Sequence, residues 1–196
     1  MDKQYIKNIL SLDAGASKVK AVIFNESGET LGLIENEFGA NISINPEESI
    51  KRILSTLSEI LDNSNLTYDE IAHYSLGVAG ISNKDARDLL FKKLEDKQIS
   101  KITHLSSDVN PVFEMNCSDN SALLVSVGTG CICLGRDDEN KIIKSAGMGL
   151  DKDPGSGFWM GRELIVNLSF SRNLDQDETE FQELLDMSLN HFDAKE

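Results

Sequence analysis

Two glycine-containing turns, each flanked by apolar runs, carry residues that could hold a phosphate. The first lies in LDAGASKVKAVIF (Leu12–Phe24), with Asp13 at the end of one run and Gly15, Ser17 and Lys18 in the turn. Small residues let backbone N–H groups approach a phosphate closely, and the carboxylate could hold a hydrated Mg²⁺. A plain β-hairpin with a surface aspartate explains the same residues, so this loop alone favours phosphate binding only slightly.

The second turn has the same design. SVGTGCICLGR (Ser126–Arg136) places Gly128, Thr129 and Gly130 between two apolar runs. The glycines can adopt positive φ, and the threonine hydroxyl can meet a phosphate. A tight hairpin is again the alternative. Two such loops in one chain are much less expected by chance than one.

A third candidate is Asp108, in LSSDVNP, directly after the strand-like run Ile102–Ser106. In open α/β sheets, ligands bind beyond the carboxyl ends of the strands. A carboxylate there could take the proton of an alcohol, as in kinase chemistry. The same residue could instead cap the helix expected from Val109. The sequence favours neither role over the other.

Two further segments carry polar residues in loops. DKDPGSGFWMGREL places Asp153 before a helix, where it could bind sugar hydroxyls or form part of an ordinary turn. FGANISINPEE places Asn41 in a loop that follows a strand, which alone indicates little.

A sheet is needed to bring these loops together. The N-terminal part predicts three strands joined by tight turns and then a helix that opens at Pro46. Strands and helices alternate after that, which implies parallel strands beside the antiparallel meander. The predicted α/β order is βββαβαβα, a mixed sheet with helices on its faces. Strands are expected at Ile9–Asp13, Val19–Phe24, Glu29–Glu37, His73–Val78 and Ile102–Ser106, and further helices at Lys84–Glu95 and Val109–Asn116.

A second meander begins after this module. It is expected to comprise strands at Ser121–Val127, Cys131–Arg136 and near Lys141–Ser145, with helices around Trp159–Ser169 and Glu180–Asn190. Because only the start of the first module is repeated, we expect one complete lobe over 1–117 and an incomplete second lobe over 118–196.

Composition narrows the class of protein. The 196 residues are 40% hydrophobic and 27% charged, as in ordinary globular proteins, and the formal net charge is −14. That charge argues against a surface for nucleic acid or anionic membranes. The N-terminal apolar run is too short for a signal peptide, and no run has membrane-spanning length. The three cysteines lack CxxC spacing, and Cys131 and Cys133 lie in an apolar run, so we expect those two to be buried reduced thiols and the protein to be cytoplasmic.

Taken in order, the motifs resemble one known family. DAGASK, Gly39–Asn41, LGVAG, Asp108, SVGTGCICLGR and DPGSGFWMGREL are similar to the motif series of the N-acetylglucosamine kinase and BadF/BadG/BcrA/BcrD ATPase family. That family has the actin-like (ribonuclease H-like) ATPase fold. The resemblance extends from about Ile9 to Leu164, and its last two motifs are the most specific.

The resemblance implies roles for individual residues. It makes Asp108 the catalytic base for a sugar hydroxyl and Asp13 a ligand of Mg²⁺. The residues that would contact ATP phosphates are Asp13, Gly15, Ser17, Lys18, Gly128, Thr129 and Gly130. Those that would form the sugar pocket are Asn41, Gly80 and Asp153.

The sequence departs from the family at several points. Ala14 and Ala16 replace common glycines, and Pro154 stands where a glutamate usually follows the aspartate. Family members also continue beyond the position of Glu196, through the rest of the second lobe and its adenosine-binding loop. We therefore expect the chain by itself to be an inefficient kinase.

The function expected from the resemblance is phosphorylation of an amino sugar by ATP with Mg²⁺, as in N-acetylglucosamine kinase. The alternatives are a BadF-type ATPase activator and a non-catalytic sugar-binding or interaction module. The expected partner is a small-molecule sugar. A homodimer, or a second chain that supplies the missing lobe, is left open.

Overall fold

The computed structural model describes residues 7–117, 121–149, 152–171 and 179–191. They form two compact units. Residues up to Leu124, together with Gly135–Ile142, make the first, and Val125–Leu134 with the chain from Ile143 make the second. The expected division into lobes at 117/118 stays a prediction. Within the described residues, no helix combines the length and apolar character that a membrane span requires.

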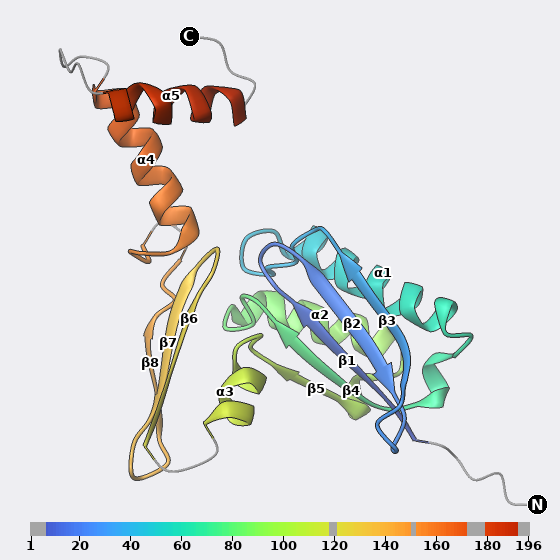
Figure 1. The fold of residues 1–196 in the computed structure, drawn as a ribbon. Helices are drawn as coiled ribbons and strands as arrows, with labels where there is room; N and C mark the ends of the chain where they lie inside the picture. The colour runs from blue at the N-terminus through green and yellow to red at the C-terminus, as the bar shows by residue number, and fades with distance from the viewer. Residues whose placement is uncertain (1–6, 118–120, 150–151, 172–178, 192–196) are drawn as a thin grey trace, which may run out of the picture. The chain divides into compact units, whose positions relative to one another are not determined.

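The first unit is built on a five-stranded mixed sheet of strand order β3-β2-β1-β4-β5 (Figure 1). Strands β1, β2 and β3 form the antiparallel meander, and β4 and β5 add to it in parallel. The predicted mixed α/β architecture is therefore confirmed. The strands are β1 (Asn8–Ala14), β2 (Val19–Phe24), β3 (Thr30–Asn36), β4 (Ile71–Val78) and β5 (Thr103–Ser106). The helices are α1 (Pro46–Asn63), α2 (Lys84–Asp96) and α3 (Asn110–Asn116), and the 3₁₀ turns Tyr68–Glu70 and Ser100–Ile102 precede β4 and β5.

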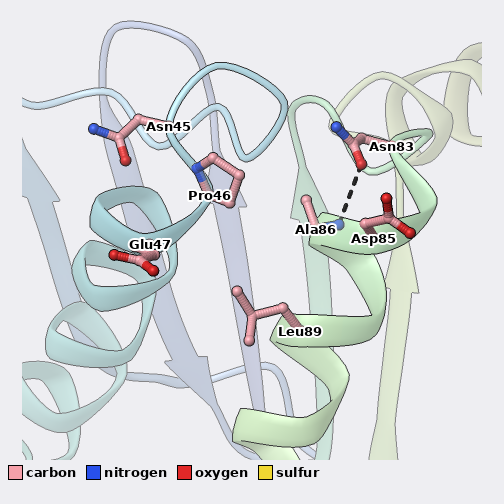
Figure 2. A pocket seen from close by; sticks show the side chains of 7 residues that line it. All are labelled: Asn45, Pro46, Glu47, Asn83, Asp85, Ala86 and Leu89. Carbon is pink, nitrogen blue, oxygen red and sulfur yellow. Dashed lines mark hydrogen bonds between the residues drawn. The ribbon is translucent and has the colours of Figure 1, made fainter.

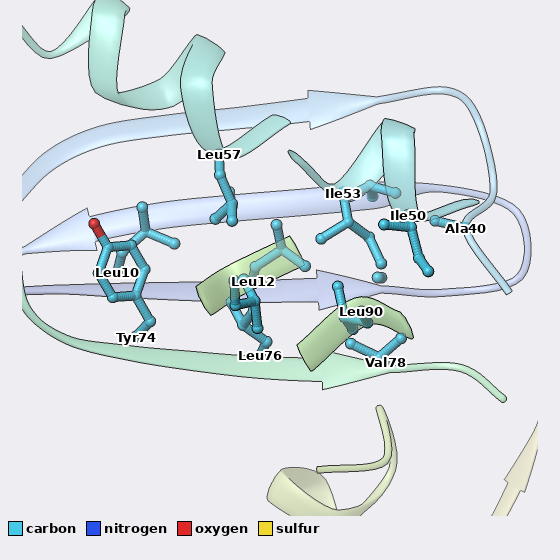
Figure 3. Packing of buried hydrophobic residues seen from close by; sticks show 14 of the residues in the cluster. Leu10, Leu12, Ala40, Ile50, Ile53, Leu57, Tyr74, Leu76, Val78 and Leu90 are labelled. Carbon is cyan, nitrogen blue, oxygen red and sulfur yellow. The ribbon is translucent and has the colours of Figure 1, made fainter. Parts of the chain in front are cut away.

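One face of this sheet carries the core, because α1 and α2 pack on the same side of it. Leu12 of β1 and Leu76 of β4 are buried there beneath Leu57 of α1 and Leu90 of α2 (Figure 3). Both helices begin at an asparagine whose side chain caps them. Asn45 accepts a hydrogen bond from the Glu48 N–H at 3.2 Å, and Asn83 accepts one from the Ala86 N–H at 3.2 Å.

The opposite face of the sheet carries polar side chains next to the first glycine turn, although Leu33 of β3 is also exposed on it. Successive residues of a strand point to opposite faces, so burial of Leu12 and Ala14 turns Asp13 away from the core. For the same reason the burial of Val19 and Ala21 turns Lys20 to the side of Asp13. Asp13 and Lys20 therefore lie on the face opposite the core, at the strand end where the first glycine turn begins.

Arg136 fixes helix α3. Its guanidinium donates to Oε2 of Glu114 at 2.7 Å and to the Cys117 carbonyl at 2.9 Å, and lies 5.0 Å from the ring centre of the buried Phe113. Cation–π contact and paired hydrogen bonds together hold an arginine with little freedom. Arg136 thus has a structural role within the first unit.

The later elements include a three-stranded sheet of order β6-β7-β8, as the second meander predicted. Its strands are β6 (Ala122–Val127), β7 (Cys131–Arg136) and β8 (Ile142–Ala146), and the helices that follow are α4 (Gly157–Ser171) and α5 (Thr179–His191). Cys131 and Cys133, expected to be buried, are instead half-buried, as is Cys117, and all three are free thiols. They lie in or beside elements that bury few side chains.

Candidate active site

The carboxyl ends of three parallel strands bring the first candidate residues together. In register, Asp13 of β1 lies beside Gly77 of β4, and Gly77 lies beside Ser106 of β5. Asp108 follows Ser106 by two residues. Because parallel strands end at the same edge of a sheet, Asp13 and Asp108 approach one another there.

Gly77 makes that approach possible. A Cβ atom at this position would lie only 3.2 Å from the Cα of Asp108, so a side chain would push the β5–α3 loop away. The proximity of the two carboxylates has an electrostatic consequence. Partial burial first, and the charge of Asp108 second, raise the pKa of Asp13, while Lys20 and Lys18 oppose the shift.

Asp108 does not occupy the capping position that the sequence left open for it. Helix α3 begins at Asn110, and its N-cap residue is Val109, which makes no side-chain capping bond. The carboxylate of Asp108 instead accepts a hydrogen bond from the Ser107 hydroxyl at 3.1 Å. Ser107 therefore orients the carboxylate, a role that the sequence analysis did not foresee.

The first glycine turn packs against the loop that carries Asn41. The Gly15 N–H donates to the Lys18 carbonyl at 3.0 Å, which closes the turn, and the Ala40 N–H donates to the Gly15 carbonyl at 2.9 Å. Gly39 lies so close to the Ala16 carbonyl that a Cβ atom would collide with it. The Gly39–Asn41 motif is thus needed for close backbone packing against the turn.

A third loop, after β4, completes this cluster. The Ala79 N–H donates to the Ala14 carbonyl at 2.9 Å, and the Ile42 N–H donates to the Ala79 carbonyl at 3.0 Å. Gly80 has φ of +80°, and a Cβ atom there would collide with the Asn41 side chain. Gly80 and Asn41, predicted for one sugar pocket, therefore lie side by side.

The two polar ends of the Asn41 side chain have different surroundings. Its Oδ1 accepts from the N–H of Ser43 at 3.0 Å and from the Ser43 hydroxyl at 2.7 Å, which makes a local turn. The side-chain NH₂ is the end that could donate to a ligand. Ser43 was not among the predicted residues, although a serine two residues after an asparagine is a common signal of such a turn.

Lys18 does not extend freely from the turn. Its Nζ lies 2.7 Å from Oε1 of Glu35, and the Nζ of Lys20 lies 2.6 Å from Oε2 of the same carboxylate. Hydrogen bonds from the two ammonium groups, Lys18 first, lower the pKa of Glu35 to about 2. Lys20 and Glu35 were both missed. The available signal for Lys20 was its position two residues after Lys18, which places both lysines on one side of an extended chain.

The second glycine turn lies in the other unit and is described by itself. The Gly128 N–H donates to the Gly130 carbonyl at 2.8 Å. Two carbonyls of the turn accept hydrogen bonds from the start of α4. The Gly157 N–H donates to the Gly128 carbonyl at 2.8 Å, and the Phe158 N–H donates to the Thr129 carbonyl at 3.2 Å. Gly128 and Gly130 could adopt positive φ, but neither of them does. The turn is closed by hydrogen bonds in ordinary backbone conformations.

Asp153 is buried in the second unit, with only 3% of its surface exposed. Its Oδ1 accepts from the Met148 N–H at 3.0 Å and its Oδ2 from the Gly149 N–H at 3.4 Å. Both oxygens thus face backbone amides of the preceding loop. A sugar hydroxyl would have to share or replace these contacts, so the predicted sugar-binding role of Asp153 stays a prediction.

A surface pocket lies between the N-terminal ends of α1 and α2 (Figure 2). It adjoins the predicted sugar site, because the N–H of its lining residue Asn83 donates to the Gly80 carbonyl at 3.0 Å. None of the predicted site residues lines it. Glu47 and Asp85 make it acidic, and both helix ends are already capped by asparagine side chains. The pocket lining consists of Asn45, Pro46, Glu47, Asn83, Asp85, Ala86 and Leu89.

Comparison with known proteins shows similarity to sugar kinases. No protein-family model matches the chain. The N-acetylmuramic acid/N-acetylglucosamine kinase of Clostridium acetobutylicum is 25% identical over 162 residues, which are 82% of this chain and 53% of the relative. The chain also matches two solved structures of candidate N-acetylglucosamine kinases, each at 18% identity. One is from Chromobacterium violaceum (TM-score 0.74) and the other from Porphyromonas gingivalis (TM-score 0.70). The matches cover 93% and 95% of this chain and 64% and 62% of those structures. The chain has the fold of these sugar kinases.

The predicted resemblance to N-acetylglucosamine-type kinases with an actin-like ATPase fold is therefore confirmed. A glycerol kinase of Xanthomonas euvesicatoria is similar over a shorter stretch, 28% identical over 105 residues, or 50% of this chain and 19% of that enzyme. The chain spans about half the length of the curated sugar kinase that it matches. The similarity thus supports a kinase-like protein without fixing its substrate.

Proposed function

We propose that this protein transfers the terminal phosphoryl group of ATP to a hydroxyl of an amino sugar, N-acetylglucosamine or a close relative. The observation that carries the proposal is the convergence of Asp13 and Asp108 over Gly77, at the carboxyl ends of parallel strands. Loops that carry Lys18 and Asn41 lie at the same strand ends. A base, a cation and a polar amide near one metal-binding carboxylate are the groups that phosphoryl transfer to an alcohol requires.

In the proposed reaction Asp108 accepts the proton of the sugar hydroxyl, while Ser107 holds its carboxylate by a hydrogen bond. The hydroxyl oxygen bonds to the phosphorus, and the bond from phosphorus to the departing ADP breaks. ATP bound with Mg²⁺ would supply the phosphoryl group and neutralise its charge. Asp13 would hold the hydrated Mg²⁺.

The remaining assignments belong to the same proposal. The two turns would contact the phosphates through Gly15, Ser17, Lys18, Gly128, Thr129 and Gly130. Asn41, Gly80 and Asp153 would bind the sugar. A cytoplasmic location, and assembly as a homodimer or with a partner chain, belong to the same proposal. Similarity to a kinase named for N-acetylmuramic acid and N-acetylglucosamine supports this class of substrate.

The test is ADP release with N-acetylglucosamine, N-acetylmuramic acid and glycerol as acceptors, with calorimetry of sugar binding in parallel. We expect turnover with an amino sugar and none with glycerol. Asp108→Asn should lower kcat about 10²–10⁴-fold while sugar affinity changes little, because an amide keeps the size of the carboxylate but accepts no proton. Asp88→Asn, an equal change of charge on the exposed side of α2, is the matched control.

Two outcomes would contradict the proposal. If the wild-type chain binds sugar but releases no ADP, the protein is a non-catalytic sugar-binding module and not a kinase. Turnover by Asp108→Asn near that of the wild type would remove Asp108 from the mechanism.

A further inference from the structure

We propose that Glu35 is a positioning residue, which holds the ammonium groups of Lys18 and Lys20 as a pair beside Asp13 so that an incoming polyphosphate meets two placed lysines. The inference rests on the proposed phosphoryl transfer and adds two residues, Lys20 and Glu35, to its site. Neither residue lies in the glycine turn itself. Both are brought to it by the register of the meander.

The register places the three side chains in one row. Asp13 of β1 pairs with Lys20 of β2, and Lys20 pairs with Glu35 of β3. Paired residues of neighbouring strands point to the same face, and Lys18, two residues before Lys20, points there as well. The row therefore runs from Glu35 through the lysines to Asp13, on the face of the sheet opposite the core.

The contacts leave the lysines able to bind an anion. Each ammonium group has three N–H donors, and each uses one on a different oxygen of Glu35, at 2.7 Å for Lys18 and 2.6 Å for Lys20. The Lys18 and Lys20 side chains remain 56% and 46% exposed. Phosphate oxygens can thus be bound without breaking either ion pair.

The charges nearby explain why two lysines are needed. Asp13 and Asp108 are close to one another, and Glu37 adds a further negative charge near Lys18. The whole chain carries a formal net charge of −14. A polyphosphate is therefore repelled unless local cations, together with a metal ion, are held where its oxygens will lie.

A purely structural role for Glu35 is disfavoured by its exposure. Ion pairs between exposed side chains contribute little to stability, because solvent screens them and long side chains lose rotamer freedom. Glu35 shares one carboxylate between two lysines, and all three side chains are partly exposed. What Glu35 does for ligand binding is to restrict the lysines before the ligand arrives.

Charge and position predict opposite results for Glu35→Gln, and this makes the test sharp. If only the charge of Glu35 matters, removing it should strengthen the binding of an anion. If Glu35 matters because it places the two lysines, removing it should weaken the binding of the anion. We expect Mg²⁺-bound inorganic triphosphate to bind Glu35→Gln about 3–10-fold more weakly than wild type by calorimetry, as the two lysines lose their fixed rotamers.

Two further variants separate the effects. Glu35→Asp keeps the charge but is too short to reach both lysines, so it should also weaken triphosphate binding. Glu26→Gln makes the same change of charge in the β2–β3 turn and should bind as wild type does. All three variants should unfold at the wild-type temperature.

The lysine side-chain NMR signals distinguish this inference from the proposed function. We expect triphosphate to shift the Lys18 and Lys20 signals in the wild type and not in Glu35→Gln. This result would support the inference even if no sugar is phosphorylated. Tighter or unchanged triphosphate binding by Glu35→Gln would overturn it even if the sugar kinase assay succeeds. Triphosphate that shifts neither lysine signal would overturn it as well.

Discussion

The five-stranded region and the later region around β6–β8 use similar sequence patterns but bury them differently. Apart from Leu134, every apolar residue that is buried among the described residues lies between Leu10 and Phe113. In β6, by contrast, Leu123, Val125 and Val127 alternate as a half-buried strand should, yet they are 70%, 54% and 57% exposed. An alternating pattern thus identifies the apolar face of a strand without showing that anything covers it.

Polar contacts take a larger part in the later region. Asp153 and Ser156 are buried there, and both bind backbone amides nearby. The glycine turn is held by main-chain hydrogen bonds to the start of α4. Such bonds each contribute less than a fully buried leucine, so we expect the later region to open at lower free energy than the five-stranded region.

The largest expected effect is a difference in stability between two leucine-to-alanine variants, one in each region. Leu57→Ala removes a fully buried side chain of α1, and we expect it to lower the free energy of unfolding by about 2–5 kcal/mol. Leu123→Ala removes the same atoms from an exposed position on β6, and should change it by less than about 0.5 kcal/mol. Urea unfolding measures both. A large loss for Leu123→Ala would mean that β6 is covered in solution, and the contrast between the regions would fail.

A pair of glycines tests close packing. Gly80 and Gly155 both have positive φ, but only Gly80 has atoms of Asn41 and Ser43 where a Cβ atom would lie. Gly155→Ala should cost about 1–2 kcal/mol from backbone strain, and Gly80→Ala roughly 2–4 kcal/mol because the collision adds to that strain. Thermal unfolding compares them. Equal losses would show that the three loops of the first unit yield easily.

Asp153→Asn should lower the local stability of the later region without affecting the five-stranded region. The amide oxygen can accept one of the two backbone hydrogen bonds, but the NH₂ group accepts none, so a loss of about 1–3 kcal/mol is expected locally. Hydrogen exchange at the amides of Met148 and Gly149 should speed up while exchange in β1 and β4 stays unchanged. Equal acceleration in both regions would mean that they open together.

The smallest effect is a gain in stability. Partial burial and Asp108 raise the pKa of Asp13 above its ordinary value of 3.8, so its charged form destabilises the fold at pH values above the raised pKa. Asp13→Asn should therefore raise the unfolding temperature at pH 7 by about 1–4 °C. The difference should vanish below pH 3.8, where Asp13 is protonated in the folded and unfolded chain alike. A lower unfolding temperature at pH 7 would contradict this account.

Much of the fold could be predicted, because local patterns suffice for it. Glycine turns, the asparagine and proline at the start of α1, and alternation in β1 and β2 are short-range signals. The position of Asp108 after β5 followed from the same reasoning. A prediction failed where the answer depends on what packs nearby, since Cys131 and Cys133 are only half-buried. Two questions that the sequence left open were decided by the tertiary structure: Asp108 is not the cap of α3, and Gly128 and Gly130 do not use positive φ.

The sequence by itself determined the order of strands and helices, the resemblance to sugar kinases, and the residue types that could bind phosphate. Only the tertiary structure decided which of them meet. Asp13 and Asp108 are 95 residues apart in the chain, and Gly77 brings them together because it has no side chain to hold β5 and its loop away. Glu35 binds Lys18 and Lys20 because the register of three strands places them on one face. Local patterns fix which face a residue takes, whereas register and close backbone approach fix its neighbours.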